Sequence, residues 1–112
     1  MNAEDDVESV AELLADDTVR CILLATREGP MSVAELSERC GVSETTVYRR
    51  IEDLQTHDLV AERTEIDEGG HHGTYEATLD RVTVDVTDDG FDLTVDRRDT
   101  MADAFTRLID EL

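Results

Sequence analysis

Residues 33–59, VAELSERCGVSETTVYRRIEDLQTHDL, contain two stretches with apolar residues at helical spacing on either side of one glycine. The first stretch covers residues 33–39, and the second covers about 44–57. Ser32 and Ser43 precede them and offer side-chain oxygens to the free amides at a helix start. Gly41 adopts a left-handed backbone without steric cost. The pattern predicts two short helices joined by a tight turn, a helix-turn-helix over residues 33–57.

The flanking patterns extend this prediction in both directions. Apolar residues at helical spacing over 7–28 predict helical structure, which Asp16 or Asp17 divides by capping a second segment, and Gly29 and Pro30 end it. After the helix pair the period changes to two, which predicts a hairpin with strands at 60–66 and 74–80 and a long tip, DEGGHHG. A second hairpin is expected over 82–97 and an amphipathic helix over 99–111.

A helix-turn-helix followed directly by a hairpin is a winged helix. The predicted fold class is therefore α+β: a winged helix-turn-helix with N- and C-terminal dimerisation helices and an additional β-hairpin. Residues 1–112 are long enough for one domain and too short for two of ordinary size, so a single domain is expected, with the wing at 60–80.

Helix 44–57 is the predicted DNA-reading element, because the N-terminal half of such a helix meets base edges in the major groove. Val47, Ile51 and Leu54 fall on one stripe and are its expected core face. Arginine can pair with guanine, and hydroxyls can bind phosphates or bases. Arg50 lies nearer the core edge, where it can reach a phosphate or a carboxylate. The DNA-binding candidates on this helix are Ser43, Thr45, Thr46, Tyr48, Arg49 and Arg50. The alternative is an exposed polar face without a ligand.

The wing adds three candidates for contacts to phosphates or the minor groove. They are Arg63 on its first strand and His71 and His72 at its predicted tip. Adjacent histidines also suggest a metal site, but no third or fourth ligand follows at a recognised spacing. Neither a metal nor another cofactor is expected.

The charge of the chain contrasts with a DNA-binding role. Asp and Glu number 29 against ten cationic residues, all arginine, so the formal net charge is -19. An acidic surface without lysine is typical of proteins in salt-rich cytoplasm, where 1 M salt screens charges beyond about 3 Å. A halophilic origin is therefore expected, with an acidic protein of ordinary habitat as the alternative. The acidity then reports the solvent and not the partner.

Other classes of protein are disfavoured by what the sequence lacks. The longest apolar run, residues 21–25, is far below the roughly 18 residues of a membrane span, and no signal sequence is recognisable, so a cytoplasmic location is expected. Cys21 and Cys40 are accordingly predicted to be reduced thiols. No nucleophile with a partnered base, glycine-rich phosphate loop or catalytic carboxylate pair stands out, so an enzyme is not expected.

Two segments, LLADDTVRCILL at 13–24 and MSVAELSERCGVSETTVYRRIEDLQTHDLV at 31–60, together with the wing, resemble the ArsR-type winged-helix regulators, especially short haloarchaeal ones. The resemblance covers about residues 10–80, and the hairpin at 82–97 departs from it. It implies a homodimer on double-stranded DNA, more often a repressor, with the first and last helices packed across a two-fold axis. Apolar stripes on both helices agree with this, although the helices could instead close the core of one chain.

A sensor role is a further hypothesis. The Cys-x-Cys motif of metal-sensing relatives is absent, but the resemblance puts Cys21 near the dimer interface, where it is a redox candidate that could form an intersubunit disulfide. The alternative is a small buried apolar residue. The competing function for the chain is a winged-helix protein-protein interaction module that does not bind DNA directly.

Overall fold

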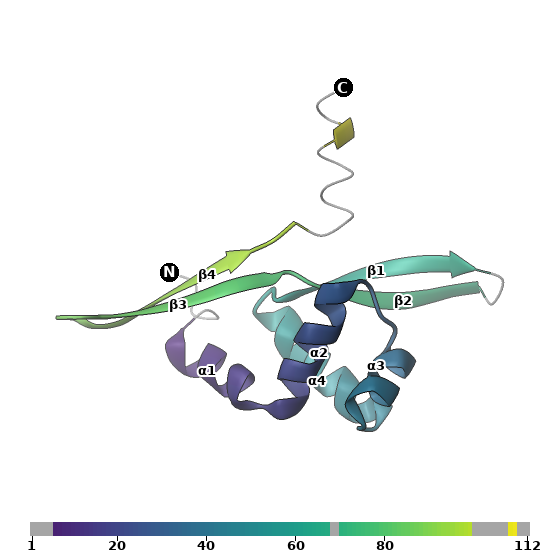
Figure 1. Ribbon diagram of the computed structural model, residues 1–112, viewed down its shortest axis with the longest axis horizontal. Helices are drawn as coiled ribbons and strands as arrows, with labels where there is room; N and C mark the ends of the chain where they lie inside the picture. Colours follow the sequence, from purple (N-terminus) through teal and green to yellow (C-terminus); the bar gives the residue numbers. More distant parts are fainter. Residues whose placement is uncertain (1–5, 68–69, 100–107, 110–112) are drawn as a thin grey trace.

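The computed structural model describes residues 6–67, 70–99 and 108–109, and shows a group of helices from which two hairpins project in opposite directions (Figure 1). The helices are α1 (Val7–Ala15), α2 (Asp17–Glu28), α3 (Val33–Cys40) and α4 (Glu44–Thr56). The strands are β1 (Val60–Asp67), β2 (Gly70–Ala77), β3 (Leu79–Thr87) and β4 (Gly90–Arg97). This α+β arrangement is a winged helix-turn-helix with an additional hairpin, as the sequence predicts.

Each helix begins at a side chain that accepts a hydrogen bond from a free backbone amide. Asp16 lies between α1 and α2, and its carboxylate accepts from the amide of Val19 at 3.0 Å, so the predicted division of the first helical segment is confirmed. Ser32 and Glu35 form a reciprocal capping box at the start of α3, and Ser43 caps α4. Gly41 has a φ of 67° and ends α3 in the predicted left-handed conformation.

The core lies where α2, α3 and α4 meet the base of the wing. Val47, Ile51 and Leu54 are each at most 1% exposed, which confirms the predicted inner stripe of α4. They join Ile22 of α2 and Leu36 of α3, both fully buried, in one apolar cluster. This burial fixes α4 against the other helices and so determines which of its faces is left for solvent.

The wing is an antiparallel pair whose register runs from Val60↔Ala77 to Asp67↔Gly70. Met31 extends this sheet through two backbone hydrogen bonds with Tyr75, at 3.0 and 2.8 Å. The predicted long tip is wrong, because residues 67 and 70–73 belong to the strands. Backbone hydrogen bonds form the ladder irrespective of side chain, so the glycines and histidines that suggested a loop are accommodated in β2.

The second hairpin has the predicted pairing, with Val82, Val84 and Val86 opposite Val95, Leu93 and Phe91. Asp88 and Asp89 form the turn between Thr87 and Gly90, which pair with each other. Arg97 and Arg98, at the end of this hairpin, donate hydrogen bonds to backbone carbonyls at the C-terminal ends of α4 and α2 respectively. The additional hairpin is thus attached to the helices at its base.

The helix predicted over 99–111 lies largely outside the described residues. Of that range the structure describes residue 99 and the helical pair Leu108 and Ile109. Within the described part of the chain, no helix is both long enough and apolar enough to cross a membrane.

Candidate nucleic-acid interface

The N-terminal half of α4 presents a polar face to solvent on the side opposite its buried stripe. Thr45, Tyr48 and Arg49 are exposed, and the Tyr48 side chain is 51% accessible. Val47 and Ile51 hold the inner side of the same turns in the core. Three of the predicted contact residues therefore share an accessible surface formed by about one and a half helical turns.

Ser43 and Thr46 have a structural task at the start of this helix. The Ser43 hydroxyl accepts a hydrogen bond from the amide of Thr46 at 3.1 Å and lies 3.0 Å from the Thr46 hydroxyl. Ser43 is exposed and Thr46 half-buried. Both residues remain at the edge of the polar face, but the hydroxyl of Ser43 is already used to stabilise the helix end.

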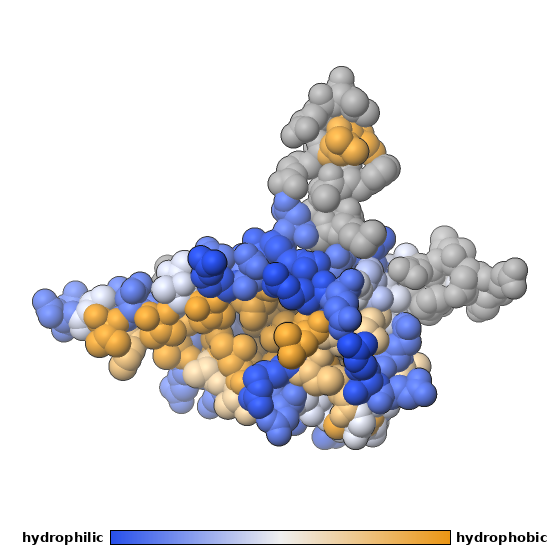
Figure 2. Space-filling model, in the orientation of Figure 1, coloured by the Kyte–Doolittle hydropathy of each residue, from blue (hydrophilic) through white to orange (hydrophobic). Residues whose placement is uncertain are grey.

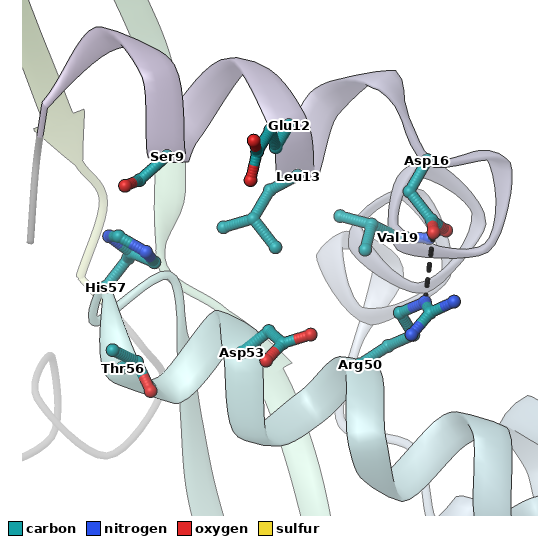
Figure 3. A pocket seen from close by; sticks show the side chains of 9 residues that line it. All are labelled: Ser9, Glu12, Leu13, Asp16, Val19, Arg50, Asp53, Thr56 and His57. Atoms are coloured by element: carbon teal, nitrogen blue, oxygen red, sulfur yellow. Dashed lines mark hydrogen bonds and ion pairs between the residues drawn. The ribbon is translucent and has the colours of Figure 1, made fainter.

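Arg50 points away from this face and toward α1 (Figure 3). Its Nε lies 3.0 Å from a carboxylate oxygen of Asp16, and both side chains are about one-third exposed. The pair borders a polar cavity of about 350 Å³ between α1 and α4. The residues around the cavity are Ser9, Glu12, Leu13, Asp16, Val19, Arg50, Asp53, Thr56 and His57. Of the two partners expected for Arg50, phosphate or carboxylate, the structure contains the carboxylate.

Arg63 is likewise engaged within the protein. Its guanidinium lies 3.8 Å from Glu76, whose other carboxylate oxygen lies 3.5 Å from Arg98. Glu76 is only 1% exposed, so an arginine of β1 and one that follows β4 compensate one buried charge. Glu76 was not predicted from the sequence. Side chains alternate between the two faces of β2, so Glu76 lies on the face opposite to Tyr75 and Ala77, where solvent exposure would be expected.

His71 and His72 belong to β2, where they pair with Ile66 and Glu65 of β1. This corrects their assignment to a loop at the tip of the wing. Their strand is nevertheless one of the two strands of the wing, so they lie on the element for which they were predicted.

Arg49 differs from the other two arginines of the region. It is exposed, and among the described residues no side chain lies within ion-pair distance of it. It is also the candidate whose guanidinium chemistry is best suited to reading a guanine. The available positive charge of this face therefore rests on Arg49.

The surroundings of the polar face are acidic. A groove of about 410 Å³ separates the start of α3, the start of α4 and the wing, and Glu44 and Glu62 both border it. Burial raises the pKa of the Tyr75 phenol in this groove, and the charge of Glu62 and the neighbouring Tyr48 raise it further. The negative charge of Glu44 interacts favourably with the partial positive charge at the N-terminus of α4. These carboxylates would repel a phosphate, which limits the polar contacts to the outer surface of the helix.

Comparison with known protein families assigns the central part of the chain. Residues 14–63, from within α1 to the middle of β1, match the family model described as a helix-turn-helix domain. The match agrees with the helix-turn-helix that α3, Gly41 and α4 form in the structure. No curated protein matches the chain.

The helix-turn-helix domain contains a disulfide that was not expected. Cys21 of α2 is bonded to Cys40 at the end of α3, so the prediction of two reduced thiols is wrong for this structure. Packing of α2 against α3 brings the two Cα atoms to 6.0 Å, within the range that a disulfide requires. Because Cys21 is bonded within its own chain, it does not form the predicted intersubunit disulfide here. A separation of 19 residues in sequence gave no sign of this contact.

Proposed function

We propose that the chain is a sequence-specific transcriptional regulator that binds double-stranded DNA by inserting α4 into the major groove. The observation that carries the proposal is the exposed row of Thr45, Tyr48 and Arg49 on the first half of α4. In a helix-turn-helix this is the part of the second helix that reaches base edges. Ser43 and Thr46 at the helix start, and Arg63, His71 and His72 on the wing, are assigned to the margins of the contact. Arg50 is assigned to positioning α4 through Asp16.

We propose further that the regulator acts as a homodimeric repressor of the ArsR type in a salt-rich cytoplasm. The resemblance over residues 10–80 supports the assignment to the ArsR type. The absence of lysine together with a net charge of -19 supports a salt-rich cytoplasm. A two-fold dimer would present two α4 helices to half-sites about 34 Å apart, so that a bound dimer would cover a promoter.

Salt accounts for how an acidic chain could hold DNA. Release of counterions normally drives association, but this contribution falls steeply as salt rises. With one free arginine on the polar face, the chain would depend on contacts to base edges and on shape. Binding should therefore change little between 1 and 3 M KCl, in contrast to ordinary basic regulators.

The decisive experiment selects operators from a random double-stranded library in 2 M KCl and then compares Arg49→Ala with Arg81→Ala. Arg81 is a matched control, because it is also exposed, lies on β3 away from α4 and contributes the same charge. Loss of a bidentate base contact weakens binding by about 1–3 kcal/mol, so Arg49→Ala should raise Kd by about five- to 150-fold. Arg81→Ala should leave Kd unchanged.

Two results would contradict the proposal. If no sequence is enriched at any salt concentration, the protein-contact function becomes the better account, and the acidic groove beside α4 would suit a partner with basic side chains. If Arg49→Ala and Arg81→Ala weaken binding equally, the contact is not made by the face of α4.

We propose that redox control of DNA binding acts through the Cys21–Cys40 disulfide within one chain, and not through a disulfide between subunits. A dithiol reductant would exchange with the Cys21–Cys40 bond, so that the dithiol becomes a disulfide while the two cysteines each take up a proton as thiols. Both cysteines are partly exposed, which permits attack on the bond. Release of α3 from α2 would loosen the helix that supports α4, and DNA affinity should fall on reduction.

A further inference from the structure

The β3–β4 hairpin carries an apolar stripe that becomes more exposed with distance from its base. Val82 and Val95, which pair near the base, are partly buried. The outer positions on the same face are uncovered, with Val84 48%, Phe91 64% and Val86 76% exposed. Figure 2 shows the corresponding hydrophobic band along this hairpin. We call Val84, Val86, Phe91 and Leu93 the hairpin stripe.

The other face of the same hairpin is suited to water. Thr83 opposes Thr94 and Asp85 opposes Asp92, and three of these four residues are exposed. An antiparallel pair with one polar and one apolar face normally packs the apolar face against something. A two-stranded hairpin is also marginally stable alone in water. The outer half of β3–β4 therefore has the composition of a covered sheet, and the described residues 6–67, 70–99 and 108–109 do not cover it completely.

The start of α1 covers the stripe only in part. Asp6, Val7 and Glu8 lie beside Phe91 and Leu93 around an open hollow of about 340 Å³. The apolar side chains at the tip remain accessible beyond this contact. Carboxylates beside the stripe argue against nucleic acid as the molecule that covers it.

We propose that a second copy of this chain covers the hairpin stripe, with the two hairpins packed face to face about a two-fold axis. The stripe has no charged or hydrogen-bonding side chain to pair with a polar partner, whereas an identical aliphatic and aromatic row buries both copies at once. The stripe lies on the hairpin that points away from the wing (Figure 1). A dimer formed there leaves both wings accessible. This inference rests on the proposed function in one respect: a regulator that binds two DNA half-sites needs two copies of the chain.

The size of the stripe indicates how strong this contact is. Together with the half-buried Val82 and Val95, the stripe covers residues 82–86 and 91–95, about 17 Å along each strand, and two strands are roughly 10 Å wide with their side chains, so each copy offers on the order of 200 Å². A standard interface takes about 800 Å² from each partner. The expected dimer is therefore weak, and DNA with two half-sites strengthens it. Two acidic chains repel each other, and salt screens this repulsion. The dimer should therefore become tighter as the KCl concentration rises.

Sedimentation equilibrium on the full chain in 2 M KCl tests the proposal with two double variants. Val86→Ser with Phe91→Ser removes one cross-strand pair of the stripe, and Asp85→Ser with Asp92→Ser removes the adjacent pair on the other face. The first variant should weaken the dimer tenfold or more. The second should dimerise at least as tightly as the parent, because it loses repulsive charge. A dimer that survives the first variant, or a parent that is monomeric up to millimolar concentration, overturns the proposal.

A tryptophan at the stripe provides a second measurement that does not depend on mass. The chain contains no tryptophan, so the emission of Phe91→Trp reports on this position alone. The emission should shift to shorter wavelength as protein concentration rises through the dimer range. A blue emission that is independent of concentration would mean that the chain covers its own stripe, and a persistently exposed emission would mean no cover; either result overturns the proposal.

Neither measurement uses DNA, so the dimer and the DNA-binding role can fail separately. Circular dichroism on each variant confirms that the fold is retained, which is expected because Val86 and Phe91 lie outside the core cluster. Binding of the stripe variant to a single half-site should equal that of the parent. If the stripe variant loses dimerisation but keeps half-site affinity, both proposals stand.

Discussion

Arg97 of β4 donates a hydrogen bond from Nη2 to the backbone carbonyl of His57, the C-terminal cap of α4, at 2.7 Å across 40 residues of sequence. Its Nε also donates to the carbonyl of Asp58 at 2.8 Å. The last carbonyls of a helix lack intrahelical partners and carry partial negative charge, so a guanidinium there both satisfies and neutralises them. The additional hairpin therefore stabilises the helix proposed to read DNA.

Arg97→Ala should lower the free energy of unfolding by about 1–3 kcal/mol, because two charge-assisted hydrogen bonds to backbone are lost. Urea unfolding followed by circular dichroism measures the change. Arg97→Lys should recover part of the loss, since it keeps the charge and can form one of the two bonds. Arg81→Ala is the control for lost charge. Equal stabilities of the Arg97→Ala and Arg81→Ala variants would show that the contact to α4 contributes nothing.

Glu76→Gln should destabilise the fold more strongly, by about 3 kcal/mol, because Arg63 and Arg98 would lose the charge that compensates them around a buried position. Thermal unfolding in parallel with Glu62→Gln, an exposed carboxylate on the neighbouring strand, gives the comparison. A similar melting temperature for the two variants would mean that the buried charge cluster is energetically neutral.

Removal of the disulfide by Cys21→Ser with Cys40→Ser should cost about 3 kcal/mol, since the bond closes a loop of 19 residues in the unfolded chain. Chemical denaturation of the variant should match that of the reduced parent protein. DNA affinity should fall on reduction of the parent and be insensitive to reductant in the variant. If the DNA affinity of Cys21→Ser still changes on reduction, the Cys21–Cys40 disulfide is not the cause of the redox response.

The N-terminus of α1 should respond to acid through Asp6. Hydrogen bonds from Ser9, first from its backbone amide and then from its side chain, lower the pKa of the Asp6 carboxyl below its ordinary value of 3.8. A carboxyl with a lowered pKa in the folded state contributes stability above the unfolded value, and this contribution is lost as pH falls through the folded one. The amide shift of Ser9, followed by NMR, should titrate below pH 3.8. Asp6→Asn should abolish that titration; a midpoint above 3.8 in the parent would contradict the cap.

The local parts of the fold could be predicted from sequence because each depends on residues close together in the chain. Ser43 and Gly41 determine helix ends by short-range hydrogen bonding and backbone freedom, and Val47 and Ile51 define a helical face by spacing alone. The partners of the candidate arginines could not be found in this way. Asp16 meets Arg50, and Glu76 meets Arg63, only because tertiary packing brings different elements together.

The same limit explains the two corrections. Cys21 and Cys40 become neighbours through the packing of α2 on α3, which no periodicity expresses. The tip of the wing was predicted as a loop from its glycines, but pairing across β1 and β2 depends on backbone groups that every residue supplies. Among the predicted contact residues, the structure separates exposed Arg49 from engaged Arg50, although they are adjacent in sequence.

The opposite directions of the two hairpins also bear on how duplicated copies of this protein could diverge. Under the proposals made above, substitutions on β3 and β4 would alter which chains associate without changing the bases that are read. Changes on the outer face of α4 would alter the operator without creating new associations. A genome could then duplicate such a gene and let the copies acquire separate targets while avoiding mixed dimers.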